Sequence, residues 1–297
     1  MVNLPSTKQL RYFVALHKHL HFGRAAAACF VTQPAFSVAI RELETTLDLK
    51  LVDRTNKKVT ITAIGQELAI QARMVLRDLE GLVEMARSNV APMSGQLRLG
   101  VIPTIAPFLL PALLPKLRRQ YPKLKLILHE DQTLKIYTGL MEGGLDIILM
   151  ALPFDLRNVE TIPLFPDPFY LAYRSGTKLL DPSNYRVEQL PQESVLLMDD
   201  GHCLRDHALS ACKIRNVDKV SPVSANSLLT LIEMVDADLG VTYLPEMALN
   251  SWLLKNTRVK TAPLKSAPKR EIGLVWRKGS ARGSEFKELG AFIRENR

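Results

Sequence analysis

The sequence predicts an α + α/β protein, in which a small helical module precedes one long helix and a larger module of alternating strands and helices. Residues 1–65 combine short amphipathic helix patterns with an excess of basic charge. Apolar residues then repeat at heptad spacing up to residue 86, and strand-like and helix-like runs alternate from residue 96. The chain has 297 residues, which is too long for one small core, so we expect two or three domains.

The composition is that of a soluble globular protein, and it suggests neither a metal nor a cofactor. Hydrophobic residues make up 47% of the chain and charged residues 23%, and no apolar run reaches the ~18 residues that a membrane span needs. The first nine residues lack the apolar core of a signal peptide, so we expect a cytoplasmic protein with no membrane partner. Only three cysteines are present and none forms a CxxC pair, which disfavours a disulfide framework and a metal site.

The N-terminal module has the pattern of a helix-turn-helix. Residues 7–19 predict a first helix from the spacing of their apolar side chains. Residues 23–30 predict a second helix, whose alanines let another helix approach closely. Thr32 is placed to cap a third helix, and Pro34 fits its first turn, where no backbone N–H is needed. Two helices joined by a tight turn are typical of proteins that bind DNA.

The third predicted helix has one apolar side and one polar side. Its buried stripe consists of Phe36, Ile40 and Leu43. Gln33, Ser37 and Arg41 lie on the opposite side, where we expect them to face the major groove. Each of these polar residues taken alone could be an ordinary solvated side chain, and the order of the whole module favours DNA binding.

A basic β-hairpin wing is predicted over residues 51–62, where apolar and polar residues alternate around a turn at residues 56–58. Residues 1–65 carry nine Lys/Arg against four Asp/Glu, a balance that favours nucleic acid as partner. The residues that we expect to contact double-stranded DNA are Thr32, Gln33, Pro34, Ser37, Arg41, Arg54, Lys57 and Lys58.

A long helix is predicted to follow Gly65. Its apolar residues step by four and three, which is a heptad seam: Leu68, Ala72, Val75, Leu79, Leu82 and Ala86. A core helix could show the same pattern, but this one lies between two modules with few local partners, which favours a dimerisation helix. Residues 89–95 contain Pro92 and two small residues, and we expect them to form a hinge.

The C-terminal module has α/β patterning with a predicted parallel sheet. Strands are predicted over residues 96–102, 124–129, 146–152, 195–198 and 271–276, with helices between them and a closing helix over residues 284–295. Two lobes crossed twice by the chain, with a cleft between them, fit this order. Thr104 and Thr133 each follow a strand, where ligands gather in open α/β sheets, although a helix cap is the commoner role.

Cys203 and Cys212 lie nine positions apart within a segment that predicts a short helix. Nine residues of helix separate two Cα atoms by roughly 13 Å, whereas a disulfide needs about 7 Å or less. A bond between them would therefore require the helix to unwind. His202, Arg205 and the start of a helix near Cys203 are suited to stabilise a thiolate. The alternative is that both cysteines are small buried hydrophobes on an ordinary helix.

The N-terminal residues, including Ala25 to Pro34 and Arg54-Thr55, resemble those of the LysR-type transcriptional regulators. The resemblance covers essentially the whole chain and implies a winged helix-turn-helix, a linker helix and a two-lobed periplasmic-binding-protein-like α/β effector domain. The implied boundaries are a DNA-binding domain over residues 1–65, a linker and dimerisation helix over 66–92, and a redox-sensing regulatory domain over 93–297. The first lobe would comprise about 93–165 and 268–297, and the second about 166–267.

Further motifs resemble those of the peroxide-sensing members of this family: Val101 to Thr104, His129 to Thr133, Asp200 to Asp206, and Cys212. This resemblance implies that hydrogen peroxide oxidises Cys203 to a sulfenic acid and that Cys212 resolves it as a disulfide. It also implies a peroxide pocket lined by Thr104, Thr133, His202 and Arg270, with Arg205 and Asp206 in support.

The implied partners are double-stranded DNA, further copies of the chain in a homodimer or homotetramer, hydrogen peroxide and RNA polymerase. Two other functions stay open from the sequence. A regulator of this family could sense a small metabolite between its lobes, with incidental cysteines. A thiol peroxidase fused to a DNA-binding module would instead be an enzyme that turns over with a reductant.

Overall fold

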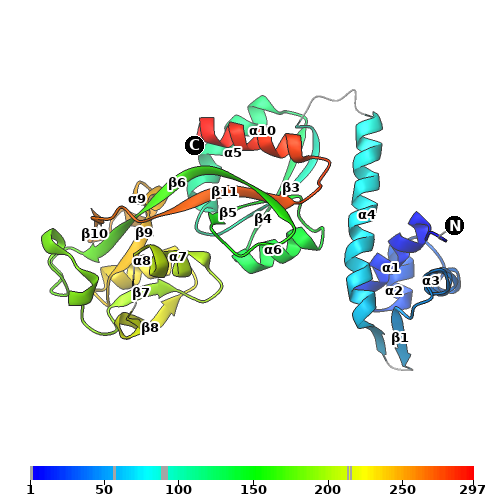
Figure 1. The fold of residues 1–297 in the computed structure, drawn as a ribbon, viewed down its shortest axis with the longest axis horizontal. Helices are drawn as coiled ribbons and strands as arrows, with labels where there is room; N and C mark the ends of the chain where they lie inside the picture. The colour runs from blue at the N-terminus through cyan, green and yellow to red at the C-terminus, as the bar shows by residue number, and fades with distance from the viewer. Residues whose placement is uncertain (1–2, 56–57, 88–92, 213, 215) are drawn as a thin grey trace. The chain divides into compact units, whose positions relative to one another are not determined.

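The computed structural model describes residues 3–55, 58–87, 93–212, 214 and 216–297. The chain divides into two compact units, an N-terminal helical unit and a C-terminal unit of strands and helices (Figure 1). Among the described helices, none is both long enough and apolar enough to cross a membrane.

The N-terminal unit is a winged helix-turn-helix followed by a long helix. Its elements are α1 (Thr7–His19), α2 (Phe22–Ala28), α3 (Gln33–Leu47), β1 (Val52–Thr55), β2 (Lys58–Ile61) and α4 (Ala63–Arg87). The first helix occupies its predicted range because Ser6 and Gln9 form a capping box, in which each side chain accepts a hydrogen bond from the other's backbone N–H. The two strands pair antiparallel, as the predicted wing requires.

The buried stripe of α3 forms the centre of the N-terminal core. Phe36, Ile40 and Leu43 are each 0% exposed, which confirms the predicted stripe. The Tyr12 ring of α1 stacks on Phe36 with 5.0 Å between ring centroids. This packing fixes α3 against α1 and leaves its polar side outward.

The long helix α4 begins earlier than the sequence predicts. The Thr62 hydroxyl accepts a hydrogen bond from the Gly65 N–H and so caps a helix that starts at Ala63 rather than after Gly65. Gly65 is required inside this first turn, because a Cβ there would lie 2.5 Å from the Leu51 carbonyl oxygen.

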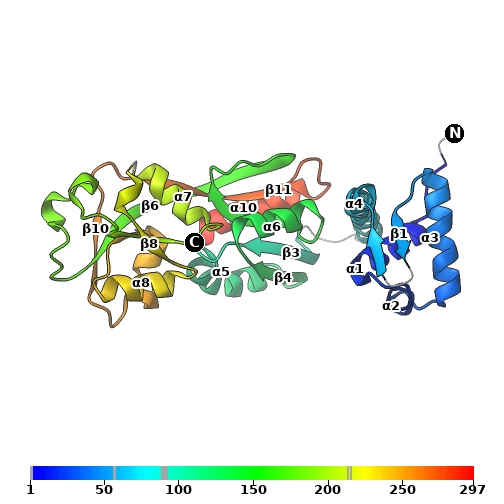
Figure 2. The same cartoon turned by 90° about the horizontal axis from the view of Figure 1, so that it is seen from below.

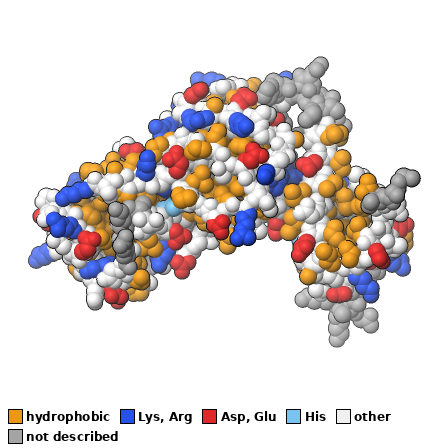
Figure 3. Space-filling view, viewed as in Figure 1, with side chains coloured by type: hydrophobic (Ala, Val, Ile, Leu, Met, Phe, Trp, Pro, Cys, Tyr) orange, Lys and Arg blue, Asp and Glu red, His pale blue; other side chains and the backbone are white. Residues whose placement is uncertain are grey.

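The apolar seam of α4 changes character along the helix. Leu68 and Ala72 pack into the N-terminal core, whereas Val75, Leu79 and Leu82 are 46%, 37% and 62% exposed. Figure 3 shows hydrophobic side chains at the surface over this helix. The side chain of Ala86, the last member of the predicted seam, lies outside the described part of the chain.

The C-terminal unit alternates strands and helices through β5 and then returns by long strands. Its elements are β3 (Gly95–Val101), α5 (Ala106–Gln120), β4 (Leu124–Glu130), α6 (Thr133–Met141), β5 (Ile147–Leu152), β6 (Val159–Arg174), β7 (Val195–Met198), α7 (Cys203–Ala211), β8 (Val220–Ala225), α8 (Leu228–Asp236), β9 (Thr242–Pro245), α9 (Glu246–Leu249), β10 (Val259–Pro263), β11 (Lys269–Arg277) and α10 (Gly283–Asn296). Short 3-10 turns cover Pro182–Asn184, Val187–Gln189, Val217–Lys219 and Trp252–Leu254.

The sheets of this unit are mixed: β3 pairs in parallel with β4 and β5, as the sequence predicts, whereas β6 and β11 are antiparallel to their neighbours. The strand order is β10-β6-β11-β5-β3-β4, with β9 also paired to β6. Only β3 with β4, β3 with β5, and β7 with β8 pair in parallel among the described strands, and β11 is antiparallel to both of its neighbours. The cause is that β6 and β11 are the two chain crossings, so they run side by side in opposite directions (Figure 2).

Two hydrophobic cores define two lobes. The first lobe has a core drawn from residues 93–165 and 272–293 together with Cys203. The second lobe has a core drawn from residues 169–259, including Leu204 and Ala208 of α7. Neighbouring residues of one short helix therefore belong to different cores.

Candidate functional site

Cys203 is the first residue of α7, and its thiol is buried at the junction of the two lobes. His202 is the N-cap with an extended backbone, as the sequence predicts for a helix that starts near Cys203. The cysteine is 3% exposed and packs in the first-lobe core, although its helix follows a strand of the second lobe. The helix N-terminus places partial positive charge near the sulfur, which favours a thiolate.

Three groups around Cys203 also favour negative charge on its sulfur. Burial is the largest influence and raises the pKa of the thiol above its ordinary value of 9.0. The Arg270 guanidinium, the Thr133 hydroxyl and the Ala151 backbone N–H each lower that pKa. The resting sulfur is therefore a protonated thiol in a dry site whose polar groups are already arranged to receive a charge.

Arg270 is held rigidly beside this site. Its Nε donates to Asp167 Oδ2 at 2.9 Å, and its Nη1 donates to the Thr104 hydroxyl at 2.9 Å. Its Nη2 donates to the Thr104 carbonyl at 3.0 Å and contacts Met247 Sδ at 3.6 Å. The Arg270 side chain is 0% exposed. A buried arginine with several fixed partners cannot swing away from the thiol.

Asp167 is the acidic partner of Arg270, and sequence reasoning missed it. Its side chain is 3% exposed, and its Oδ1 accepts a hydrogen bond from the Met247 backbone N–H at 3.1 Å. Burial raises the pKa of Asp167 more than Arg270 and the Met247 N–H lower it. One sequence feature could have indicated Asp167: it is a charged residue between two prolines, Pro166 and Pro168, in a segment with the pattern of a strand.

Thr104 and Thr133 meet where two strands end. β3 and β4 are parallel neighbours, so the residues that follow them lie at the same edge of the sheet. Both threonines are 2% exposed. The Thr104 hydroxyl accepts a hydrogen bond from Arg270. The Thr133 hydroxyl lies near the Cys203 sulfur and has no hydrogen bond of ordinary geometry to any of the described residues.

His202 lies next to this edge and is neutral. Its Nε2 is 3.3 Å from the Gln132 amide nitrogen, which can only donate, so His202 Nε2 accepts. Burial lowers the pKa of His202, and Asp199 and Asp131 oppose that effect. Gln132 was not among the predicted site residues, although it lies directly before Thr133.

Arg205 and Asp206 are not brought to the thiol in this structure. The Arg205 Nε forms an ion pair with Asp200 at 3.0 Å, and its Nη1 donates to the Met198 carbonyl. Asp206 is exposed, and its charge raises the pKa of Cys203 only slightly relative to burial. Arg205 therefore ties α7 to the segment before it, and Asp206 lies at the surface.

Cys212 is at the other end of α7 and packs against the second-lobe core. Burial raises the pKa of its thiol to about 12. The hydroxyls of Tyr185 and Tyr243 bond each other nearby, and Cys212 contributes to raising the pKa values of both. Cys203 and Cys212 are both free thiols, and the intact helix between them spans roughly 13 Å.

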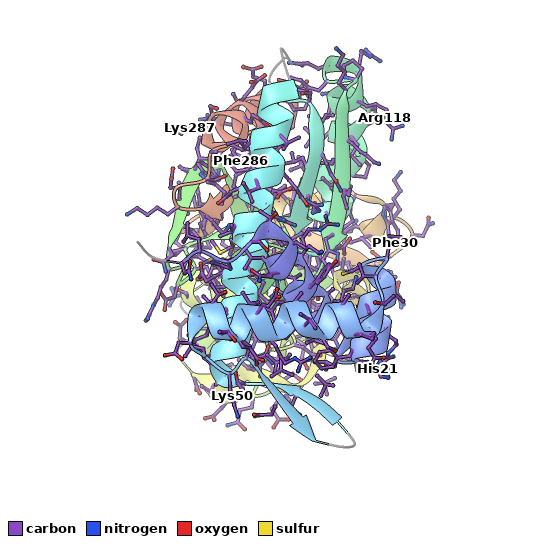
Figure 4. All side chains as sticks on the ribbon, turned by 90° about the vertical axis from the view of Figure 1, so that its right-hand side faces the viewer. His21, Phe30, Lys50, Arg118, Phe286 and Lys287 are labelled. Atoms are coloured by element: carbon purple, nitrogen blue, oxygen red, sulfur yellow. The ribbon has the colours of Figure 1, made fainter. Side chains whose placement is uncertain are left out.

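The predicted DNA-contacting residues of the third helix lie at its start and along its outer side. Thr32 is the N-cap of α3 but makes no capping hydrogen bond, so its hydroxyl is available. Gln33, Pro34 and Arg41 are exposed and Ser37 is half-buried. Figure 4 shows α3 lengthwise, with Phe30 before its start and Lys50 beyond its end.

The basic residues of the wing are only partly described. Arg54 lies on β1 and Lys58 on β2, where they belong to the paired hairpin. Lys57, in the turn, lies outside the described residues.

Family comparisons divide the chain as the structure does. Residues 7–66 match the bacterial regulatory helix-turn-helix protein, lysR family, and residues 90–297 match the LysR substrate binding domain. The HTH-type transcriptional regulator EstR of Acinetobacter baylyi is 41% identical over 287 residues, which are 96% of this chain and 95% of that protein.

Two further comparisons concern proteins named for peroxide or for OxyR. A probable hydrogen peroxide-inducible genes activator of Streptomyces viridosporus is 41% identical over 293 residues, 98% of this chain and 94% of that protein. A solved structure of full-length OxyR from Pseudomonas aeruginosa, with aspartate in place of a cysteine, has a TM-score of 0.79 at 34% identity. It covers 97% of this chain and 94% of its own.

Proposed function

The chain belongs to the LysR family of bacterial transcriptional regulators, and on this premise we propose that it is a DNA-binding regulator that senses hydrogen peroxide through Cys203. It is a regulator and not an enzyme. The observation that carries the proposal is the buried Cys203 thiol, which lies at a helix N-terminus beside the fixed Arg270 guanidinium and the Thr133 hydroxyl. These polar groups would stabilise the thiolate once the thiol loses its proton, which an apolar pocket around a structural cysteine does not do.

The proposed first step is a two-electron oxidation of sulfur. The Cys203 thiolate attacks one peroxide oxygen and the O–O bond breaks. The second oxygen leaves as hydroxide and takes up a proton to form water, while the sulfur becomes a sulfenic acid. Thr133 and Arg270 face the sulfur and would stabilise negative charge that develops on the attacked peroxide. Thr104 and His202 would complete the pocket.

The proposed second step joins the two cysteines. The Cys212 thiolate attacks the Cys203 sulfur, the S–O bond breaks, and the departing hydroxide is protonated to water. Since an intact α7 holds the sulfurs too far apart, the helix must unwind before the bond forms. Cys203 would leave the first-lobe core, and the contact between the lobes would change.

The proposed output is altered DNA binding by an oligomer. The polar side of α3, through Gln33, Ser37 and Arg41, would read the major groove, and the basic wing would contact the backbone or minor groove. The exposed half of the α4 seam supports pairing of two chains, and a homotetramer would span paired half-sites. We place the regulator in the cytoplasm, with RNA polymerase as its partner at the promoter.

The proposal is tested by treating the reduced full-length protein with hydrogen peroxide and mapping thiols by non-reducing mass spectrometry. We expect a Cys203–Cys212 linkage and a changed affinity for operator DNA in the parent, and neither in Cys203→Ser. A Cys203→Ser variant that keeps its full response to peroxide would contradict the proposal and favour a metabolite sensor. Many rapid turnovers with a thiol reductant would instead favour a peroxidase.

A further inference from the structure

The helix that carries Cys203 has a second contact with the first lobe, through a histidine that the proposed chemistry does not use. His207 lies one turn after Cys203 on α7, and its Nε2 is 2.8 Å from the carbonyl oxygen of Pro153, which follows β5. A carbonyl oxygen only accepts, so Nε2 carries the proton. The Nδ1 atom is buried and has no hydrogen-bond partner among the described residues.

The two sides of α7 belong to different lobes. Cys203 and His207 are four residues apart and share the side that faces the first lobe. Leu204 and Ala208, also four residues apart, are each 2% exposed and pack in the second-lobe core. Cys203 and His207 therefore both join α7 to the first lobe, beside the contact of its N-cap His202 with Gln132.

We propose that His207 is a positioning residue that holds α7 in its reduced conformation and so opposes closure of the Cys203–Cys212 disulfide. This inference rests on the proposed peroxide switch. Oxidation changes Cys203 directly, which leaves the hydrogen bond from His207 to Pro153 as a polar link from within α7 to the first lobe, beside the contact of the N-cap His202 with Gln132. When Cys203 leaves its pocket to meet Cys212, the turn that contains His207 must move with it.

The bond from His207 to Pro153 would then exist in the reduced form and be absent from the disulfide form. If only one state makes a contact, removing that contact shifts the equilibrium toward the other state. The shift equals the free energy that the contact contributed. A net hydrogen bond of ordinary strength corresponds to a shift of about 2- to 10-fold. The polar groups that favour a charge on the Cys203 sulfur are Arg270, Thr133 and Ala151, so the rate of its first oxidation should not depend on the His207 imidazole.

The experiment compares the full-length parent with His207→Leu and His207→Gln. Leucine keeps apolar volume but cannot donate, whereas the glutamine amide can still donate to the Pro153 carbonyl. Each reduced protein is mixed with hydrogen peroxide and quenched over time with dimedone and N-ethylmaleimide, so that thiol, sulfenic acid and disulfide are counted by mass spectrometry. Each is also equilibrated with defined ratios of reduced and oxidised glutathione.

We expect His207→Leu to favour the disulfide about 2- to 10-fold in the glutathione equilibrium and to shorten the lifetime of the sulfenic acid. The rate at which the Cys203 thiol disappears should equal that of the parent, and His207→Gln should restore parent values. An unchanged equilibrium in His207→Leu, or an equal shift in His207→Gln, would overturn the inference. A parent that forms no Cys203–Cys212 disulfide would instead defeat the proposed function.

Discussion

Arg270 on β11 lies directly opposite Asp167 on β6, and their side chains form an ion pair that is almost completely shielded from water. The two residues are antiparallel partners in the strand register, and two guanidinium nitrogens lie 2.9 Å from Asp167 Oδ2. Both strands are crossings between the lobes. Asp167 also bonds the backbone of Met247 in α9, and Arg270 also bonds Thr104 of the first lobe. The group that faces Cys203 is therefore tied to both lobes at once.

Removing Arg270 should destabilise the C-terminal unit strongly. Arg270→Met leaves the Asp167 carboxylate buried without its cation, and we expect the free energy of unfolding to fall by about 3–5 kcal/mol. Urea unfolding followed by tryptophan fluorescence measures this, because both tryptophans, Trp252 and Trp276, lie in this unit. The double variant Arg270→Met/Asp167→Leu should recover most of the loss. Equal stability of the single and double variants would show that the pair is not the cause.

Alkaline pH should destabilise the same unit through Cys212. The pKa of its thiol is about 12 in the folded chain, against an ordinary value of 9.0. Below pH 9 both states hold the proton, so the contribution to stability is complete. Between pH 9 and 12 the unfolded chain releases a proton that the folded chain keeps, so stability falls by about 1.4 kcal/mol per pH unit for this group.

The matched comparison for this pH dependence is Cys212→Ala against Ser210→Ala, an exposed position on the same helix. Cys212→Ala should flatten the decline of the unfolding free energy at alkaline pH, while Ser210→Ala should follow the parent. The decline should not vanish, because burial also raises the pKa values of Cys203 and Tyr185. Identical slopes in all three proteins would show that the Cys212 thiol is not held protonated.

The predictable parts of this molecule depend on residues close together in the chain. The bounds of α1, the buried stripe of α3 and the start of α7 at Cys203 follow from helical periodicity and capping. Thr104 and Thr133 could be placed at one sheet edge because each follows a strand. Local patterns of this kind do not depend on the register of distant strands.

The unpredicted parts depend on contacts that are distant along the chain. Asp167 and Arg270 are 103 positions apart and meet only through the register of β6 and β11. The antiparallel pairing of β11 with the predicted parallel strands could not be foreseen for the same reason, since the direction of β11 relative to β5 is set by the chain crossings. β9 and β10 are short strands that pair with β6 and have little alternation of their own.

The exposed half of α4 should hold two chains together. Leu82 is 62% exposed on a helix whose first two seam residues, Leu68 and Ala72, pack into the N-terminal core. A charge at this position should oppose burial against a second copy. We expect Leu82→Glu to lower the oligomeric state measured by size-exclusion chromatography with light scattering. Gln71→Glu adds the same charge at an exposed polar position of α4 and should leave the oligomer intact. Equal masses for both variants would contradict a dimerisation role for the seam.

Arg41 should determine which DNA sequence the protein prefers, and the wing lysines should contribute affinity for any DNA sequence. Arg41 is exposed on the outer side of α3, where a guanidinium can donate two hydrogen bonds to one guanine. We expect Arg41→Ala to reduce discrimination between the operator and a base-substituted duplex by about 1–3 kcal/mol. Fluorescence anisotropy with both duplexes at several salt concentrations measures discrimination and salt dependence together.

Lys57→Ala is the contrasting variant, because a phosphate contact carries no base information. It should weaken binding to both duplexes alike. The slope of log affinity against log salt concentration should fall by about one, because one phosphate contact is lost. Arg41→Ala should change the ratio of the two affinities more than the salt dependence. If Arg41→Ala instead weakens both duplexes equally, α3 does not read bases through this residue, and the polar side of the helix contacts only the DNA backbone there.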